Sequence, residues 1–415
     1  MLKAKSNTFN KVSIPWGAWH GDGDLDLLFP TQWKVNVHGI KDAEKLSWTD
    51  MQKGLDLPHG TVSLQKLAAG KQNAIIAVED ISRPCQLESI LNKIVSDLNR
   101  AGLMNNQIRF VICNGAHAPM SKGQMIKKYG ANLLNEFLFL NHNPYENLTD
   151  TQIELDKIPV LLNSFFYEAD LKIAVGTIMP HSFAGFSSGA KLLLPGLSDI
   201  ATLERTHKKV MMGFSGGVND VEINKFRTAI EEVALKIGVD YFCGVVPNSC
   251  REIAGVFSGD IITAHRKGVD FARAIFETDI KDIADIAVLN SYPKDTELIQ
   301  AGAALMPLKT INTSIIEKNG TFVIISKCSD GFGYHSLFGP GMRLYKKTMK
   351  QGMLKKRDLI VFSPGVNEAE FKTMYWRGYT LVNKWESVLE ILIKKYPSDC
   401  KVNILPHAPL QLLKR

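Results

Sequence analysis

Residues 171–191 read LKIAVGTIMPHSFAGFSSGAK, an apolar run followed by a loop rich in glycine and serine. The run 171–175 predicts a buried strand. Glycine and serine let a backbone approach an anion closely and offer it N–H and hydroxyl donors. The loop is not a Walker A loop, because Lys191 follows Ala190 rather than standing in a Gly-Lys-Ser/Thr triplet. The stretch therefore predicts a strand that delivers His181 and Lys191 to a ligand site.

Two earlier apolar runs have the same character. Residues 73–78 lead into Asp80-Ile81-Ser82-Arg83, and residues 108–113 lead into His117. Helical segments, 86–101 and 122–129, follow them. Strands that alternate with helices predict an α/β fold, in which ligands bind beyond the carboxyl ends of the strands. We therefore expect Asp80, Arg83, His117 and His181 to converge on one cleft.

A second series of apolar runs begins near residue 283. Runs at 283–289, 321–326, 358–362 and 380–382 alternate with helical segments such as 385–395. This pattern predicts two α/β domains, an N-terminal one at 1–279 and a C-terminal one at 280–399. The pattern does not decide to which domain the last strand, near 400–415, belongs, and a return to the first domain is one alternative.

Composition and charge restrict the class of function. The formal net charge is +7, and the densest basic run, from Lys346 to Arg357, has only Tyr345 as an aromatic neighbour. Nucleic-acid sites interleave basic and aromatic residues, so no nucleic-acid partner is predicted. No run of about 18 apolar residues exists, so we expect no membrane-spanning helix. The polar start and six scattered cysteines indicate a cytoplasmic protein with free thiols.

The histidines indicate which type of reaction the predicted site could catalyse. Each candidate residue taken alone is more often structural, but three successive strand ends that all carry such groups favour a site. Two histidines facing one cleft suit a reaction that needs a base on one side of a carbon and an acid on the other, as in a racemase or epimerase. Removing hydrogen next to a carboxylate requires an electron-accepting cofactor or a metal. We predict that the cofactor binds at Lys191, and the imidazole of His207 suits a metal such as nickel or zinc.

These residues resemble those of a known family, the nickel-pincer-nucleotide-dependent lactate racemases. The densest match is PHSFAGFSSGAKLLLPG at 180–196, followed by His207. Further matches lie at 80–84, 115–120, 259–265, 292–300 and 330–333. The resemblance spans nearly the whole chain, and it implies two α/β domains with the cofactor and active site in the cleft between them.

The resemblance also implies a role for each site residue. Lys191 would carry the cofactor, a pyridinium-3,5-bisthiocarboxylic acid mononucleotide, in covalent linkage, and His207 would ligate its nickel. His117 and His181 would be the paired acid and base during hydride transfer through a 2-keto acid. Cofactor contacts would come from Asp80, Ile81, Ser82 and Arg83, and substrate contacts from Arg83 and Gln300. The implied partners are a small 2-hydroxy acid and the enzymes that make the cofactor.

Three positions depart from the family pattern. Ala118 stands where an arginine is frequent, Ile299 where an aromatic residue is usual, and Ala303 where lactate racemases place a lysine for the substrate carboxylate. These changes favour a 2-hydroxy acid other than lactate, bulkier or a sugar acid. Two alternatives to a racemase stay open, a non-catalytic homologue that binds cofactor or nucleotide and a metal-dependent hydrolase. The hydrolase is weakened by the lack of an HxH or HExxH spacing.

Overall fold

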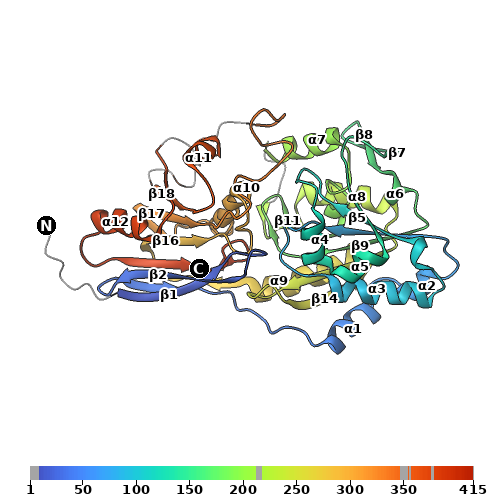
Figure 1. The fold of residues 1–415 in the computed structure, drawn as a ribbon, viewed down its shortest axis with the longest axis horizontal. Coiled ribbons are helices and arrows are strands. Elements are labelled where there is room, and N and C mark those ends of the chain that lie inside the picture. Colours follow the sequence, from blue (N-terminus) through green and yellow to red (C-terminus); the bar gives the residue numbers. More distant parts are fainter. Residues whose placement is uncertain (1–8, 212–216, 346–353, 355–356, 375–377, 415) are drawn as a thin grey trace. The chain divides into compact units, whose positions relative to one another are not determined.

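The computed structural model describes residues 9–211, 217–345, 354, 357–374 and 378–414, and these form two compact units. The first unit comprises residues 1–41, 276–334 and 345–415, and the second comprises residues 42–275 and 335–344. Figure 1 labels their elements along the chain. Each unit is built on its own six-stranded sheet.

The sheet of the second unit has the strand order β14-β13-β9-β4-β5-β6. Its strands are β4 (Ala74–Glu79), β5 (Ile108–Cys113), β6 (Leu138–Asn141), β9 (Leu171–Thr177), β13 (Tyr241–Pro247) and β14 (Ile253–Gly259). All neighbours run parallel except β13 and β14. Because β9, β4 and β5 are adjacent and parallel, their carboxyl ends lie at the same edge of the sheet.

Helices cover both faces of this sheet. One face packs against α1 (Trp48–Asp56), α2 (Leu64–Ala68), α3 (Glu88–Arg100), α4 (Lys122–Tyr129) and α5 (Ala131–Glu136). Figure 1 shows α4 and α5 beside β5 and β9. Strand β4 is buried at all six positions, as expected for a parallel strand covered on both faces.

The unit contains further short elements and three longer helices besides these. They are η1 (Asn105–Gln107), β7 (Leu148–Leu155), β8 (Ile158–Asn163), α6 (Ser164–Tyr167), β10 (Pro180–His181), β11 (Ala184–Phe186), η2 (Gly189–Leu192), α7 (Ile200–Met211), β12 (Gly217–Val218), α8 (Lys225–Ile237) and α9 (Thr263–Phe276). Helix α6 contacts β4, and η2 contacts both β4 and β9. The glycine-rich loop therefore packs directly on the central strands.

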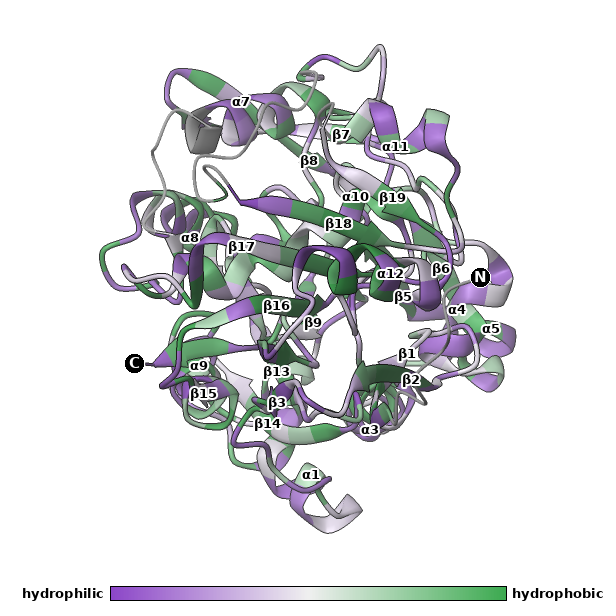
Figure 2. Cartoon of the chain, turned by 90° about the vertical axis from the view of Figure 1, so that its left-hand side faces the viewer, coloured by the Kyte–Doolittle hydropathy of each residue, from purple (hydrophilic) through white to green (hydrophobic). Residues whose placement is uncertain are grey.

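The other unit holds a fully parallel sheet in the order β19-β18-β17-β16-β20-β3. Its strands are β3 (Lys34–Val37), β16 (Ala284–Asn290), β17 (Ile316–Ile325), β18 (Asp358–Phe362), β19 (Thr380–Val382) and β20 (Lys401–Leu405). Figure 2 shows β16 and β18 as largely hydrophobic. A hairpin of β1 (Phe9–Trp16) and β2 (Gly23–Pro30) and the helix α12 (Trp385–Lys395) pack on one face.

The opposite face of this sheet is covered by α10 (Leu298–Ala301), η3 (Gly302–Lys309) and α11 (Glu368–Met374). A small parallel pair, β15 (Glu277–Asp279) and β21 (Leu412–Lys414), completes the unit. The predicted α/β class is confirmed in both units.

The compact units differ from the predicted boundaries, 1–279 and 280–399, in three ways. Residues 1–41 group with the later part of the chain, because β3 pairs with β20 and the β1–β2 hairpin packs on that sheet. The last strands, β20 and β21, do pair with β3 and β15 from within residues 1–279, but all four strands belong to the unit that also contains β16. Residues 335–344 belong to the earlier unit. Each difference depends on a long-range contact that local sequence patterns do not contain.

Two sequence predictions concerned a membrane-spanning helix and the basic run between Lys346 and Arg357. No helix in the described part of the chain is long and apolar enough to cross a membrane. Of the basic run, Lys346, Lys347, Lys350, Lys355 and Lys356 lie outside the described residues. Arg357 is described, and its guanidinium donates to the Ser314 hydroxyl at 2.8 Å.

Candidate active site

Strands β4 and β5 end side by side, and the residues after them form the first part of the site. Asp80 directly follows β4, and His117 lies four residues beyond β5. The His117 Nδ1 atom lies 2.6 Å from the Asp80 Oδ2 atom. These two predicted site residues are therefore in direct contact.

Asp80 is held in its ionised form. Burial alone would raise its pKa, but His117, Arg83 and the Ser82 hydroxyl together bring the pKa well below its ordinary value of 3.8. An ionised carboxylate only accepts hydrogen bonds, so His117 donates its Nδ1–H to Asp80. In neutral His117 the lone pair is then on Nε2, and proton transfer by this residue would run through Nε2.

Arg83 lies close to Asp80 in the chain but is not its ion-pair partner. The Arg83 Nη1 atom donates to the Ser82 hydroxyl at 2.9 Å, and over the described ranges the guanidinium forms no ion pair. The Arg83 side chain is nevertheless buried. A buried guanidinium without a carboxylate partner is well suited to an anionic ligand.

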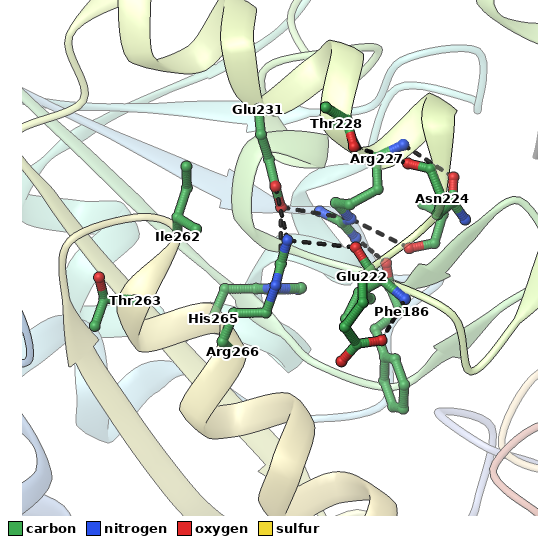
Figure 3. Close-up of polar contacts among 12 residues, drawn as sticks. Phe186, Glu222, Asn224, Arg227, Thr228, Glu231, Ile262, Thr263, His265 and Arg266 are labelled. Carbon is green, nitrogen blue, oxygen red and sulfur yellow. Dashed lines mark hydrogen bonds and ion pairs between the residues drawn. The ribbon is translucent and has the colours of Figure 1, made fainter. Parts of the chain in front are cut away.

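The loop between β11 and η2 is held in place by Arg227 of α8. Arg227 is fully buried, and its guanidinium donates to the carbonyl oxygens of Ala184 at 3.2 Å, Ser188 at 3.1 Å, and Phe186. Figure 3 shows Arg227 between Phe186 and Glu231. One side chain thus binds three carbonyls of the segment that leads to Lys191.

Glu231 and Arg266 complete the charge balance around this guanidinium. The Arg227 Nε atom lies 3.8 Å from the Glu231 carboxylate, which also accepts from the Arg266 Nη2 atom at 2.7 Å (Figure 3). Burial lowers the pKa of Arg227 to about 10, which leaves it charged at neutral pH. The loop is therefore fixed by a permanent cation rather than by a titrating group.

His265 of α9 supports the same loop from another side. Its Nε2 atom lies 2.9 Å from the Ser187 carbonyl oxygen, so Nε2 carries the hydrogen. Gly189 has φ +61°, and a Cβ atom there would come within 2.9 Å of the His265 ring. Glycine at 189 thus satisfies both a left-handed backbone and a close approach.

Lys191 presents an unusual amine. Burial, and after it the charges of Arg83 and Arg227, lower the pKa of Lys191 from 10.5 to about 7. Within the part of the chain that the structure describes, its Nζ atom has no hydrogen bond or ion pair. A substantial fraction of Lys191 is therefore the neutral, nucleophilic amine at neutral pH.

His207 projects from α7 as a neutral imidazole. Its Nδ1 atom lies 2.7 Å from the Leu203 carbonyl oxygen, so Nδ1 carries the hydrogen and Nε2 the lone pair. Burial lowers the pKa of His207 to about 4. Histidines that bind metals commonly donate the other ring N–H to a carbonyl in this way, so His207 has the form of a metal ligand.

These groups line one pocket of about 540 Å³, a volume that includes its open mouth. Its wall contains Asp80, Arg83, His117, Lys191, His207 and, in addition, Glu79, Ser188 and His335. The Ser188 hydroxyl is buried and has no hydrogen-bond partner among the described residues. The pocket therefore combines an acid/base histidine, a nucleophilic amine, a metal-type histidine and donors for an anion.

The other predicted site residues are not among those that line this pocket. His181 does not line the pocket; its ring contacts Phe183 at 5.6 Å between centroids, and Phe183 in turn contacts His207 at 6.1 Å. Ile81 packs against the core beneath the sheet edge, and Ser82 bonds Asp80 and Arg83. Gln300 lies on α10, in the unit that does not contain the pocket. The roles predicted for these four residues stay predictions, as do those of the residues that line the pocket.

His335 and Arg227 were not predicted from the sequence, whereas Ser188 belongs to the loop whose serines were expected to offer hydroxyl donors to an anion. His335 follows the glycine-rich turn 330–333, which was noted only as a family match. The glycines around it, with a histidine between them, are the one local signal that could have drawn attention to it. Arg227 had no such signal, since a charged residue on a helix is usually exposed.

No group of three or more His, Cys, Asp or Glu side chains that could hold a metal occurs among the residues described. A single histidine, His207, fits a metal whose other ligands come from a bound group.

The fold and the pocket define an α/β protein in which Asp80 and His117, just beyond strands β4 and β5, line one pocket with Lys191 of η2. Residues 20–218 match the family model of the lactate racemase N-terminal domain. The chain is 28% identical to the lactate racemase of Lactiplantibacillus plantarum, over 69% of this chain and 68% of that protein. It is also 28% identical to the lactate racemase of Thermoanaerobacterium thermosaccharolyticum, over 68% of this chain and 66% of that protein.

The chain is therefore similar in sequence to the lactate racemases, and this similarity indicates an isomerase of the racemase class. The lactate racemase apoprotein of T. thermosaccharolyticum has a similar fold, with a TM-score of 0.78 at 22% identity, and the match covers 98% of this chain and 100% of that chain. A protein from Thermotoga maritima matches with a TM-score of 0.65 at 18% identity, over 90% of this chain and 100% of that one.

Proposed function

We propose that the protein is a racemase or epimerase of a small 2-hydroxy acid that works with a nickel-pincer nucleotide joined to Lys191. The observation that carries the proposal is one pocket holding the Asp80–His117 pair, the unpaired Lys191 amine and the neutral His207. The lactate racemase relatives support the reaction class.

The residues of the pocket fit such a group. Lys191 has the depressed pKa, about 7, that covalent attachment through an amine requires. His207 offers one nitrogen ligand, and the absence of a three-ligand cluster in the described residues agrees with a metal held mainly by the cofactor. The unpartnered Ser188 hydroxyl and the Arg83 guanidinium suit a nucleotide phosphate or a carboxylate. When bound, the group would accept hydride from C2 of the substrate and return it.

The two histidines would carry the proton. Neutral His117 accepts the hydroxyl proton of the substrate at Nε2, while Asp80 stabilises the imidazolium that results. His181 accepts hydrogen bonds at Nδ1 from the Phe183 and Ala184 amides, at 3.2 and 3.4 Å, so its own hydrogen is on Nε2. To donate to the oxygen of the 2-keto acid, His181 would have to be the imidazolium, which gives up these two hydrogen bonds at Nδ1. Transfer of the Nε2 proton would then leave a neutral ring, and the roles of the two histidines exchange in the reverse direction.

The substrate is proposed to be a 2-hydroxy acid other than lactate. Ala303 and Ala118 remove cationic side chains that lactate racemases and their relatives often carry, and Ile299 removes an aromatic one. Smaller side chains leave more room and fewer carboxylate partners. A bulkier 2-hydroxy acid, or a sugar acid epimerised at C2, fits these changes better than lactate does.

The experiment uses protein co-produced with the cofactor-making enzymes and a panel of single stereoisomers deuterated at C2. We expect stereoisomer exchange with deuterium retained in the product, since hydride stays on the cofactor. Wash-out of deuterium into water would contradict hydride transfer, and turnover of lactate alone would contradict the substrate proposal. His117→Ala and His181→Ala should abolish exchange and leave the Lys191 adduct in place.

The two other functions make opposite predictions in the same experiment. A non-catalytic homologue would carry the adduct without exchange, although the 2.6 Å contact between Asp80 and His117 argues for a working acid/base pair. A metal-dependent hydrolase would bind metal without a Lys191 adduct. The lack of a group of three or more His, Cys, Asp or Glu ligands among the described residues argues against it.

Asp80→Asn tests the orientation of His117. The amide cannot stabilise the imidazolium, so we expect exchange to slow by about 10²-fold or more, within the range of general acid/base catalysis. Nickel content and the Lys191 adduct should stay unchanged. Ser82→Ala removes a hydroxyl that donates to Asp80 and accepts from Arg83 but leaves the carboxylate in place, and it serves as the comparison, with a loss below about tenfold. Equal losses in the two variants would refute a special role for Asp80.

A further inference from the structure

His335 is a third histidine in the pocket, beside His117 and His207. It belongs to residues 335–344, a segment from late in the sequence that is part of the unit containing the pocket. Its ring lies 5.7 Å from the His117 ring and 5.7 Å from the His207 ring, between centroids. His335 thus lies between the proposed base and the proposed metal ligand.

The segment is anchored on both sides of the site. The Ser336 amide donates to the Ala116 carbonyl at 2.8 Å, next to His117, and Arg343 pairs with Glu204 of α7 at 3.0 Å, one turn before His207. Leu337 and Leu344 pack with Ala116 and Leu203 in a buried cluster. The backbone of the segment is therefore fixed relative to both of the histidines that His335 contacts.

The orientation of the His335 ring is also fixed. Its Nδ1 atom accepts a hydrogen bond from the Leu337 amide at 3.2 Å, and its ring packs on Phe338 with centroids 4.5 Å apart. Because Nδ1 accepts, the hydrogen of the ring is on Nε2. His335 is more than nine-tenths buried, and its Nε2 has no hydrogen-bond partner among the described residues.

His335 and His207 are opposite tautomers. In His207 the hydrogen is on Nδ1 and the lone pair on Nε2, which is the arrangement of a metal ligand. In His335 the arrangement is reversed, so Nε2 is a donor, and metal binding would cost the Leu337 hydrogen bond. The pocket also holds Arg83, whose guanidinium has no ion pair in the described part of the chain.

We propose that His335 binds the substrate, donating its Nε2–H to a carboxylate oxygen of the 2-hydroxy acid in the same pocket as Arg83. This inference rests on the proposed function, because it assumes that a 2-hydroxy acid occupies the pocket. It assigns to His335 a share in carboxylate recognition, which is distinct from proton transfer by His117 and from metal binding by His207.

The test measures equilibrium binding of 2-hydroxyisobutyrate, which has no hydrogen on C2 and cannot react, to cofactor-loaded full-length protein. His335→Phe keeps a ring of similar size without a donor and should weaken binding by about 10- to 100-fold, as for loss of one charge-assisted hydrogen bond. His335→Gln keeps an N–H near the Nε2 position and should stay within about threefold of the unmodified protein. Nickel content and the Lys191 adduct should be unchanged in both.

Further measurements distinguish a failure of the role proposed for His335 from a failure of the proposed function. In turnover, His335→Phe should raise KM much more than it lowers kcat, as for a contact made equally in ground and transition states. Unchanged binding in His335→Phe, or loss of nickel in that variant, would overturn the role of His335 while leaving the proposed function intact. Should His335→Phe fail to fold, His335→Leu replaces it with the same expected result. Failure of the unmodified protein to bind the acid, or to carry the adduct, would count against the proposed function itself.

Discussion

Lys191→Ala is expected to abolish covalent attachment of the cofactor, so that intact-mass analysis finds only the unmodified chain and stereoisomer exchange falls to background. The physical reason is the loss of the one unpaired amine that lines the pocket. Lys208→Ala is the matched control, because Lys208 is exposed on α7 and pairs only with Glu204 among the described residues. That variant should carry the adduct in full yield, and an adduct surviving on Lys191→Ala would disprove the attachment site.

The same lysine has a signature that needs no cofactor. Its pKa is lowered from 10.5 to about 7, so its neutral fraction rises as the pH passes through 7. Labelling of the cofactor-free protein with an amine-selective reagent, followed by peptide mass analysis, should show a midpoint near pH 7 at Lys191. Exposed lysines should show midpoints near their ordinary value of about 10.4. A midpoint near 10 at Lys191 would contradict the electrostatic description of the pocket.

Arg227→Met is expected to produce the largest loss of stability. The substitution leaves three buried carbonyl oxygens, those of Ala184, Phe186 and Ser188, without their donor, and it removes one cation beside Glu231. Removing one partner of a buried charged network costs about 3–5 kcal/mol. For a unit of this size that corresponds to a fall in Tm of roughly 10 °C.

A matched variant on the same helix separates this effect from a general one. Lys236 is exposed on α8, and Lys236→Met should change the free energy of unfolding by less than about 0.5 kcal/mol. Arg227→Met should also reduce the yield of the Lys191 adduct, because the loop that presents Lys191 loses its main support. A normal Tm for Arg227→Met would show that the loop does not depend on this guanidinium.

Much of the secondary structure follows from local pattern. The predicted strand 108–113, the helix 122–129 and the helix 385–395 coincide with β5, α4 and α12. These elements combine an apolar periodicity with clear ends, such as the capping box at Ser121, in which the Ser121 and Gln124 side chains each bond the other's backbone amide. Parallel order follows as well, since strands that alternate with helices favour it.

The candidate site was predictable where it follows strand ends. Asp80 and His117 could be expected to meet, because adjacent parallel strands bring their carboxyl ends to one edge. Arg227 could not be predicted, because its role depends on three carbonyls some 40 residues earlier in the chain. His335 could not either, because residues 335–344 join the pocket through contacts more than 130 residues apart in sequence.

By itself the sequence determined the α/β class, the strands that carry the site, and the identity of Asp80, His117, Lys191 and His207 as candidates. Those features depend on local periodicity and on residue type, which any segment of the chain carries within it. Only the tertiary structure decided the membership of the two units, the tautomers of the histidines and the depressed pKa of Lys191. Each of these depends on burial and on hydrogen-bond partners that distant segments supply, and such partners exist only once the chain has folded.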